Sequence, residues 1–277
     1  METVVITGAT SGIGLELTKK FILRNARIIM AVRNESKAKQ IIEKLNYEHI
    51  VVLKLDLNSK ASTIEFVDKL KQYDVDIFVN NAGVYHLDKQ INQDNKETTM
   101  ATNYLNTFLL NELLIPYFLT LDHQVNLILT SSIVYKNGKL NYDDFYSLNN
   151  YRKIQVYANT KLAICRYFTY LLDKYKDSNI KFNLTHPGIV YTPIIQKGYK
   201  SKFFVFCAKV FMKTFFNSVS NAADVDLYCL NEKDKNGDFV GPRFLNIKGK
   251  PKIIKLKKIA YQDVDKLIAF SKKELEL

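Results

Sequence analysis

Tyr157 and Lys161 lie four positions apart in the segment Tyr-Ala-Asn-Thr-Lys, so a helix would place both side chains on one face. The ordinary pKa of a tyrosine hydroxyl is about 10, too high for efficient proton abstraction near neutral pH. An ammonium group beside the hydroxyl stabilises the phenolate and lowers that pKa. The pair therefore has the chemistry for moving a proton to or from an oxygen, although the spacing alone occurs often by chance.

Near the start of the chain, a glycine-rich segment directly follows an apolar run at residues 3–7. Gly8 and Gly12 suit a tight turn in which the backbone approaches a ligand, and Gly14 would allow the following helix to pack closely. The free N–H groups at the start of a helix attract phosphate. The segment thus predicts a dinucleotide-binding turn that includes Gly8, Thr10, Ser11, Gly12, Ile13 and Gly14.

The elements that must position these residues alternate along the chain. Short β-branched runs occur at 3–7, 27–32, 50–55, 76–79, 125–130 and 180–185. Helical apolar spacing occurs at about 12–25, 35–46, 60–72, 97–120 and 155–177. Such alternation predicts an α/β fold, a single-domain Rossmann-type doubly wound parallel sheet with helices on both faces. Later, a helix is expected to end near 231, one or two strands at 238–256 with a turn near Lys248-Gly249, and a helix at about 262–275.

The spacing Thr-Gly-x3-Gly-x-Gly resembles the classical short-chain dehydrogenase/reductase family. Asp56, with Leu57 after it, matches the family aspartate that binds adenine. The motif at residues 80–83 matches the Asn-Asn-Ala-Gly of the cofactor floor, and residues 187–192 match the segment that contacts the nicotinamide carboxamide. The resemblance implies that these segments contribute the cofactor-binding residues Asn80, Ala82, Gly83, Pro187, Gly188, Val190 and Thr192.

The same resemblance assigns catalytic roles. Ser132, after the strand at 125–130, matches the serine that hydrogen-bonds the substrate oxygen, with Ser131 the neighbouring candidate. Asn103 matches the asparagine that holds a water in a proton relay, although Asn106 replaces the glycine common three positions later. The implied reaction is hydride transfer between nicotinamide and a substrate carbon. Tyr157 would exchange the proton, and Lys161 would also bind the nicotinamide ribose.

Arg33 guides the choice of cofactor. An acid at the end of the second strand usually holds the adenosine ribose of NAD, but this chain has Ala-Val-Arg-Asn there. An arginine fork can instead bind a 2′-phosphate through two hydrogen bonds. NADP(H) is therefore favoured, with NAD(H) as the alternative, since Ser11 stands where many NADP-dependent relatives carry a second basic residue.

Composition and charge limit the partners, metal sites and cellular locations that the chain can be expected to have. The formal net charge is +12, but the lysines are scattered, so no nucleic-acid partner is expected. Three widely spaced cysteines indicate free thiols, and the four histidines show no metal-ligand spacing and are expected in surface or loop positions. Neither a signal peptide nor a membrane span is evident. These features predict a cytoplasmic protein with no metal site.

Residues 191–220 are expected to form a substrate lid within one catalytic domain covering 1–277. The alternative for 201–216 is an interfacial helix touching membrane, because its lysines and phenylalanines separate on a helical wheel. Both predict a small apolar alcohol or carbonyl substrate. The motif His-Pro-Gly at 186–188 and the Ser132–Tyr157 spacing resemble the retinol-dehydrogenase-like branch.

Relatives commonly pair through the helices at 97–120 and 155–177, so the resemblance offers a homodimer as one option and leaves the oligomeric state open. A different class of function is also open: a catalytically silent nucleotide-sensing or regulatory protein on the same fold. Such proteins typically lose the tyrosine or lysine, which this chain retains. A dinucleotide-using isomerase would need a longer substrate domain.

Overall fold

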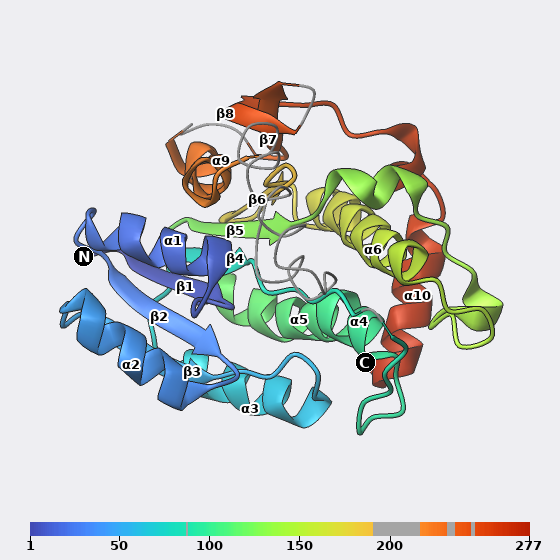
Figure 1. The fold of residues 1–277 in the computed structure, drawn as a ribbon, viewed down its shortest axis with the longest axis horizontal. Helices are drawn as coiled ribbons and strands as arrows, with labels where there is room; N and C mark the ends of the chain where they lie inside the picture. Colours follow the sequence, from blue (N-terminus) through green and yellow to red (C-terminus); the bar gives the residue numbers. More distant parts are fainter. Residues whose placement is uncertain (87, 191–216, 232–235, 245–246) are drawn as a thin grey trace, which may run out of the picture.

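The central sheet is the organising element of the computed structural model, which describes residues 1–86, 88–190, 217–231, 236–244 and 247–277 (Figure 1). Its strand order is β3-β2-β1-β4-β5-β6-β7-β8. All neighbours pair in parallel except β8, which runs antiparallel to β7. The strands are β1 Thr3–Thr7, β2 Arg27–Val32, β3 Ile50–Lys54, β4 Ile77–Asn80, β5 Val125–Thr130, β6 Ile180–Thr185, β7 Phe239–Phe244 and β8 Lys248–Ile253.

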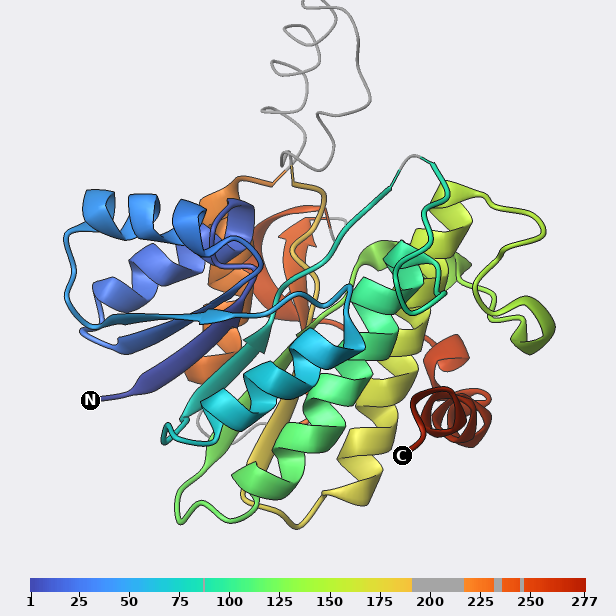
Figure 2. The same ribbon diagram turned by 90° about the horizontal axis from the view of Figure 1, so that it is seen from below.

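Helices cover both faces of this sheet (Figure 2). On one face lie α1 (Gly12–Ile22), α2 (Glu35–Leu45) and α9 (Val219–Asn231). On the other lie α3 (Lys60–Leu70), α5 (Asn106–Phe118) and α6 (Lys153–Lys174), and α10 (Val264–Leu275) packs outside α6. Because both faces are covered, β1 and β4 are buried along their whole length, as expected for continuous apolar strands. The predicted single-domain α/β fold is confirmed.

The sheet order reverses between β1 and β4. From β1 the chain proceeds to β2 and β3 on one side, then returns to place β4 on the other side of β1. Loops after these two strands diverge, and ligands of open α/β sheets bind at such a point, beyond the carboxyl ends of the strands. The glycine-rich turn and the residues after β4 and β5 therefore meet at this edge.

Two predicted elements differ in detail. The helix expected at 97–120 is divided into α4 (Thr98–Met100), a π-helical turn at Ala101–Leu105, and α5. In the C-terminal hairpin the turn precedes β8, because Lys248 and Gly249 lie within that strand. Gly249 adopts a φ of 101° there, so the glycine marks an irregular strand rather than the turn. Short 3-10 turns at 133–137, 142–144 and 258–261 were also not predicted.

The expected lid and the expected interfacial helix lie largely outside the described residues, as do Thr192 and Cys207. Within the described part of the chain, no helix is long and apolar enough to cross a bilayer. In the same part, no group of three or more acidic, cysteine or histidine side chains is placed to hold a metal ion.

Candidate active site

A cavity of about 710 Å³ lies at the carboxyl ends of the parallel strands. It extends from the glycine-rich turn, past the ends of β2, β3, β4 and β5, to the start of α6 and the segment after β6. Of the residues predicted from sequence, those lining it are Gly8, Thr10, Ser11, Gly12, Ile13, Arg33, Asp56, Leu57, Ala82, Gly83, Ser132, Tyr157, Lys161, Pro187, Gly188 and Val190. Three described residues that were also predicted, Gly14, Asn80 and Asn103, do not line it.

The glycine-rich turn presents unsatisfied donors to the cavity. Gly8 and Gly12 have φ angles of 72° and 53°, a region that favours glycine. Ser11 occupies the N-cap of α1 but its side chain makes no capping hydrogen bond, and the first turn carries no acid. The N–H groups at this helix terminus are therefore available to an anion.

Gly14, in the first turn of α1, packs closely against the glycine-rich turn. A Cβ at this position would lie 2.5 Å from the Gly8 carbonyl oxygen and 2.7 Å from Asn81 Nδ2. The Asn81 amide in turn donates to the Thr7 carbonyl at 2.8 Å, and the Thr7 hydroxyl accepts from the Ala82 N–H at 2.9 Å. The absence of a side chain thus allows α1 to contact a turn that is itself fixed to the loop after β4.

Asn80 supports the site indirectly. It is buried in β4, and its amide pairs with the Asn111 amide of α5 through hydrogen bonds of 3.0 and 3.1 Å. Buried amides need such partners, since an unpaired one is costly. Asn80 therefore connects the sheet to α5 rather than facing the cavity.

The end of β2 carries positive charge. Arg33 and Lys37 both line the cavity, and both are exposed. Asn34 caps α2 by accepting a hydrogen bond from the Lys37 N–H at 2.8 Å. Glu35, the first acid after β2, is not among the lining residues. Lys37 was missed from sequence, although recognising Asn34 as a cap would have placed it in the first turn of α2, beside the Arg33 loop.

The family-atypical Asn106 has a local role. Its amide donates to the Leu57 carbonyl at 2.8 Å, and thereby connects the start of α5 to the loop after β3. Asp56, on the same loop, accepts from the Asn58 N–H at 3.0 Å, and its own N–H bonds the Ser62 hydroxyl. The replacement of glycine by asparagine therefore stabilises the loop that lines the cavity.

Lys161 is held between α6 and β5. Its ammonium group donates to the Thr130 carbonyl at 2.9 Å and lies 5.7 Å from the centroid of the Tyr157 ring. Only 5% of Lys161 is exposed. The helical spacing predicted from sequence thus places both side chains at one end of the cavity, with Ser132 beside them.

Burial shifts both groups toward their neutral forms. It raises the pKa of Tyr157 to about 12, against the lowering effect of a hydrogen bond with Ser132. It lowers the pKa of Lys161 to about 8. The expected lowering of the tyrosine pKa is therefore outweighed by desolvation in the protein alone, and added positive charge would have to reverse it.

The two neighbouring serines have different surroundings. Ser131 is buried, and its hydroxyl donates to the Lys161 carbonyl at 3.1 Å and contacts Cys165 Sγ at 3.2 Å. Ser132 is partly exposed and interacts with Tyr157. Ser131 therefore connects the end of β5 to α6, whereas the Ser132 hydroxyl lies beside Tyr157 in the cavity lining.

Asn103 lies in the π-helical turn, a distortion that frequently accompanies functional sites. Its Oδ1 accepts from the Val84 N–H at 2.7 Å, and its Nδ2 donates to the Val84 carbonyl at 2.8 Å. Gly83 lies between this side chain and the Lys161 ammonium. The side chain of Asn103 thus fixes the loop after β4, and a relay through that side chain would need these bonds to open.

An apolar wall completes the catalytic end and was missed from sequence. It includes Tyr85, whose ring meets that of Tyr157 edge-on at a centroid distance of 5.5 Å, together with Val134, Ile154 and Ile189. Burial also raises the pKa of the Tyr85 hydroxyl. Tyr85 and Val134 lie two residues after matched motif residues, Ile154 lies three residues before Tyr157, and Ile189 lies within the matched segment 187–192. Their nearness to a motif was the sequence signal for them.

Gly188 holds the segment after β6 close to the rest of the site. It has a φ of 80°, and a Cβ there would collide with the Ile247 carbonyl. The Pro187 carbonyl accepts from Asn217 Nδ2 at 2.8 Å. The predicted contact segment is thus anchored at the mouth of the cavity.

Comparisons with known proteins agree with this architecture. A family model described as short chain dehydrogenase matches residues 2–202. The chain belongs to the short-chain dehydrogenase family. Retinol dehydrogenase 14 of Mus musculus is 32% identical over 207 residues, a match covering 69% of this chain and 62% of that protein. Human polyprenol dehydrogenase is 32% identical over 202 residues, covering 69% and 61%.

Solved structures show the same fold. An uncharacterized protein from Mycobacterium paratuberculosis has a TM-score of 0.81 at 26% identity, covering 100% of this chain and 94% of that one. An alcohol dehydrogenase from Thermococcus sibiricus, complexed with 5-hydroxy-NADP, has a TM-score of 0.65 at 18% identity, covering 86% and 94%. The chain spans only about 60% of the length of these retinol and polyprenol dehydrogenases. The matches show the family and its retinol-dehydrogenase-like branch.

Proposed function

We propose that the protein is an NADP(H)-dependent oxidoreductase that interconverts an alcohol and a carbonyl on a largely apolar substrate. The observation that carries the proposal is the convergence of Ser132, Tyr157 and Lys161 at one end of a cavity whose other end is bordered by Arg33 and Lys37. A dinucleotide joins a reactive ring to a charged adenosine end, and this cavity offers a distinct environment for each.

The residues present fit such a cofactor. The uncapped N-terminus of α1 and the two left-handed glycines form a cradle for a pyrophosphate. Asp56 and Leu57 would border the adenine, and Pro187, Gly188 and Val190 the nicotinamide. When bound, the cofactor would supply the hydride donor or acceptor. At the end of β2, the cations Arg33 and Lys37 line the cavity and no acid does. This arrangement favours the 2′-phosphate of NADP(H) over the ribose hydroxyl of NAD(H).

The chain's own residues would handle the proton. Ser132 would donate a hydrogen bond to the substrate oxygen and share its developing charge. Tyr157 would give its proton to that oxygen in reduction and accept one in oxidation. Lys161, held by the Thr130 carbonyl, would stabilise the phenolate left on Tyr157. Asn103 would keep the loop at Gly83 in place beside the ammonium.

The apolar wall supports the substrate class. Tyr85, Val134, Ile154 and Ile189 offer no charge to a substrate beside Tyr157. Two similar proteins are named for retinol and polyprenol, both apolar alcohols. We infer a cytoplasmic protein in which residues 191–220 act as a lid. The competing peripheral membrane contact through 201–216 is tested by co-flotation with anionic vesicles.

The test is turnover of a panel of apolar aldehydes, ketones and alcohols, followed at the nicotinamide absorbance with each cofactor. Tyr157→Phe removes one oxygen and keeps the ring, and should lower kcat by about 10² to 10⁴-fold. Cofactor binding should persist, because the cradle is untouched. Cofactor binding without turnover by the parent protein would instead favour the catalytically silent nucleotide sensor, and full activity of Tyr157→Phe would refute the assigned role.

The same assay tests the cofactor choice. Arg33→Ala and Lys37→Ala should each weaken NADPH binding by about tenfold or more, since each removes a charge-assisted contact with phosphate. Binding of NADH should change little. Lys39→Ala, on the same helix but absent from the cavity lining, is the matched control. Equal losses for the two cofactors would contradict a 2′-phosphate site.

A further inference from the structure

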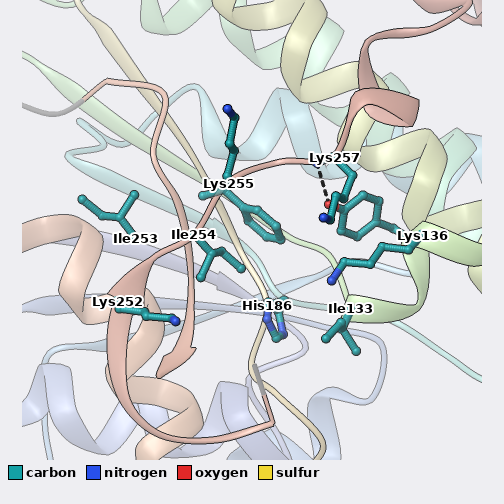
Figure 3. A pocket seen from close by; sticks show the side chains of 10 residues that line it. Ile133, Lys136, His186, Lys252, Ile253, Ile254, Lys255 and Lys257 are labelled. Carbon is teal, nitrogen blue, oxygen red and sulfur yellow. Dashed lines mark hydrogen bonds between the residues drawn. The ribbon is translucent and has the colours of Figure 1, made fainter. Parts of the chain in front are cut away.

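A second cavity, of about 340 Å³, lies beside the catalytic one and shares Ile133 with it. Its walls come from the 3-10 turn at 133–137, the end of β6 and the strand β8 with the residues after it. Apolar side chains that include Ile254 lie there among lysines (Figure 3), and Phe239 also lines the cavity. Apart from His186, of the His-Pro-Gly motif, no residue of a recognised motif lines this cavity.

Four lysines give the cavity a concentrated positive charge: Lys136, Lys252, Lys255 and Lys257. Across the described part of the chain, none of their ammonium groups has an acidic partner within 4.0 Å. In Figure 3 the nitrogens of Lys136 and Lys252 point inward from opposite sides toward His186, whereas that of Lys255 points away. Unpaired like charges that face one space repel each other, and an anion would relieve that repulsion.

His186 adds a buried donor to the same cavity. It lies in the loop directly after β6, one of the two kinds of position expected for it, but its exposed fraction is 0%, because it lies beneath β7 and β8. Its Nδ1 accepts a hydrogen bond from the Gly188 N–H at 3.1 Å, so the proton of the neutral ring is on Nε2. Burial and the Lys136 ammonium lower the pKa of His186 to about 4, which keeps the ring neutral near pH 7.

Among the residues that the structure describes, the Nε2–H of His186 has no hydrogen-bond partner. A Cβ on Gly241 would lie 2.5 Å from this nitrogen, so only a glycine at this position leaves room for the imidazole ring. Gly241 pairs with Lys252 across β7 and β8. A buried donor without a partner is unusual in a folded protein and indicates a missing acceptor.

We propose that this cavity binds a phosphate monoester group, with Lys136 and Lys252 as its cations and the Nε2–H of His186 as its buried donor. Several separate point charges suit a dianion with three acceptor oxygens, whereas the flat carboxylate is matched by the arginine fork, which is absent here. Ile133, Phe239 and Ile254 would accommodate an apolar substituent on the ester. The phosphate could belong to a soluble metabolite or to an acidic phospholipid head group.

Butyl phosphate is the probe, titrated into the full chain at constant ionic strength. The readout is the Cε1–H resonances of the four histidines. Saturating NADP⁺ is included in one series and omitted in another, so that oxyanion binding in the catalytic cavity is recognised separately. His186→Asn assigns the resonance and retains an acceptor for the Gly188 N–H. We expect a saturable shift of His186 in both series.

The double variant Lys136→Ala/Lys252→Ala should weaken this binding by about tenfold or more, because charge-assisted hydrogen bonds to the phosphate are lost. Lys39→Ala/Lys176→Ala removes the same charge from exposed positions elsewhere and should leave the affinity unchanged. Both pairs are on the surface or its margin, so folding is not at risk. Thermal unfolding curves of the variants verify this.

Cosedimentation with phosphatidylcholine vesicles, with and without phosphatidic acid, identifies the source of the phosphate. Vesicle binding that requires phosphatidic acid and is lost in Lys136→Ala/Lys252→Ala would assign the site to a lipid head group. Binding of butyl phosphate alone would assign it to a soluble ester. The proposal is overturned if neither probe binds, or if the double variant binds both as tightly as the parent.

Discussion

The burial of Lys161, which we propose takes part in catalysis, lowers its pKa and also destabilises the fold. Only 5% of the residue is exposed, and burial lowers its pKa from 10.5 to about 8. Below pH 8 the group is charged in both the folded and unfolded states, and the folded state bears the full cost of desolvation. Between the two pKa values the folded state releases its proton while the unfolded state keeps it. Stability therefore rises with pH in this window.

Replacing Lys161 by Met tests this directly. The stability of the parent relative to Lys161→Met should increase by roughly 1 to 3 kcal/mol between about pH 7 and pH 9.5. The hydrogen bond to the Thr130 carbonyl is stronger from the ammonium than from the neutral amine, so its loss offsets part of this increase. Urea unfolding of the cofactor-free protein measures the difference, with exposed Lys176→Met as the control. A difference that does not change with pH would show that Lys161 is not desolvated as described.

At this scale, the spacing of Tyr157 and Lys161 was not sufficient by itself, and the family resemblance was needed to select them together with Ser132. The structure places all three residues in the lining of one cavity. Neither spacing nor resemblance could predict His186 or Tyr85. The burial of His186 arises from β7 and β8, more than fifty residues later in the chain. Contacts of this kind depend on the tertiary arrangement and leave no local pattern.

Among the elements, the strands of the first six βα units match their predicted ranges closely, since an apolar run bounded by polar turns has one stable placement in a covered parallel sheet. The π-helical turn at Ala101–Leu105 was missed because its residues have ordinary helical periodicity. It is instead stabilised by long-range bonds, such as that of Asn103 with Val84. The hairpin turn was expected near Lys248 and Gly249, but β8 begins at Lys248. Gly249 has a positive φ within that strand and marks an irregularity there.

The contact between α1 and the glycine-rich turn yields an element-scale prediction. Gly14→Ala would place a Cβ 2.5 Å from the Gly8 carbonyl, and backbone cannot rotate away as a side chain can. The helix must move outward, so we expect a loss of about 1 to 3 kcal/mol in the free energy of unfolding. Cofactor affinity should fall as well, since the donors of α1 move with it. Calorimetry of unfolding and of NADPH binding measures both effects.

Lys19→Ala on the exposed side of α1 is the matched control, and should change stability by no more than about 0.5 kcal/mol. Gly14→Ala with parental stability and parental affinity would show that α1 does not rest on the turn. A loss of stability alone would separate the packing role of Gly14 from the presentation of the helix terminus.

For the molecule as a whole, the position of α10 determines how much of the outer surface of α6 is exposed (Figure 1). It buries Leu267, Ile268 and Leu275 in the core that contains α5 and α6. Ser271 hydrogen-bonds the Tyr104 hydroxyl at 2.7 Å, next to α5. Arg166 of α6 is 4% exposed, and it bonds the Ile259 carbonyl and lies 3.6 Å from Asp263. The chain's own C-terminal helix thus covers the outer side of α6.

This placement bears on the homodimer that the family resemblance offers as one option, which would pair α5 and α6 with their counterparts. Such a dimer would have to displace α10 and expose its buried leucines to water, at about 1.5 to 3 kcal/mol for each large apolar side chain. We therefore expect a monomer of 32.0 kDa by light scattering after size exclusion.

Leu267→Asp would place an unpaired charge beneath α10, lower the unfolding temperature and promote association through the uncovered α6. Ala269→Asp, on the exposed side of α10, should remain monomeric and stable. A parent protein of twice the mass at every concentration, with α10 still protected from hydrogen exchange, would mean that pairing uses another surface.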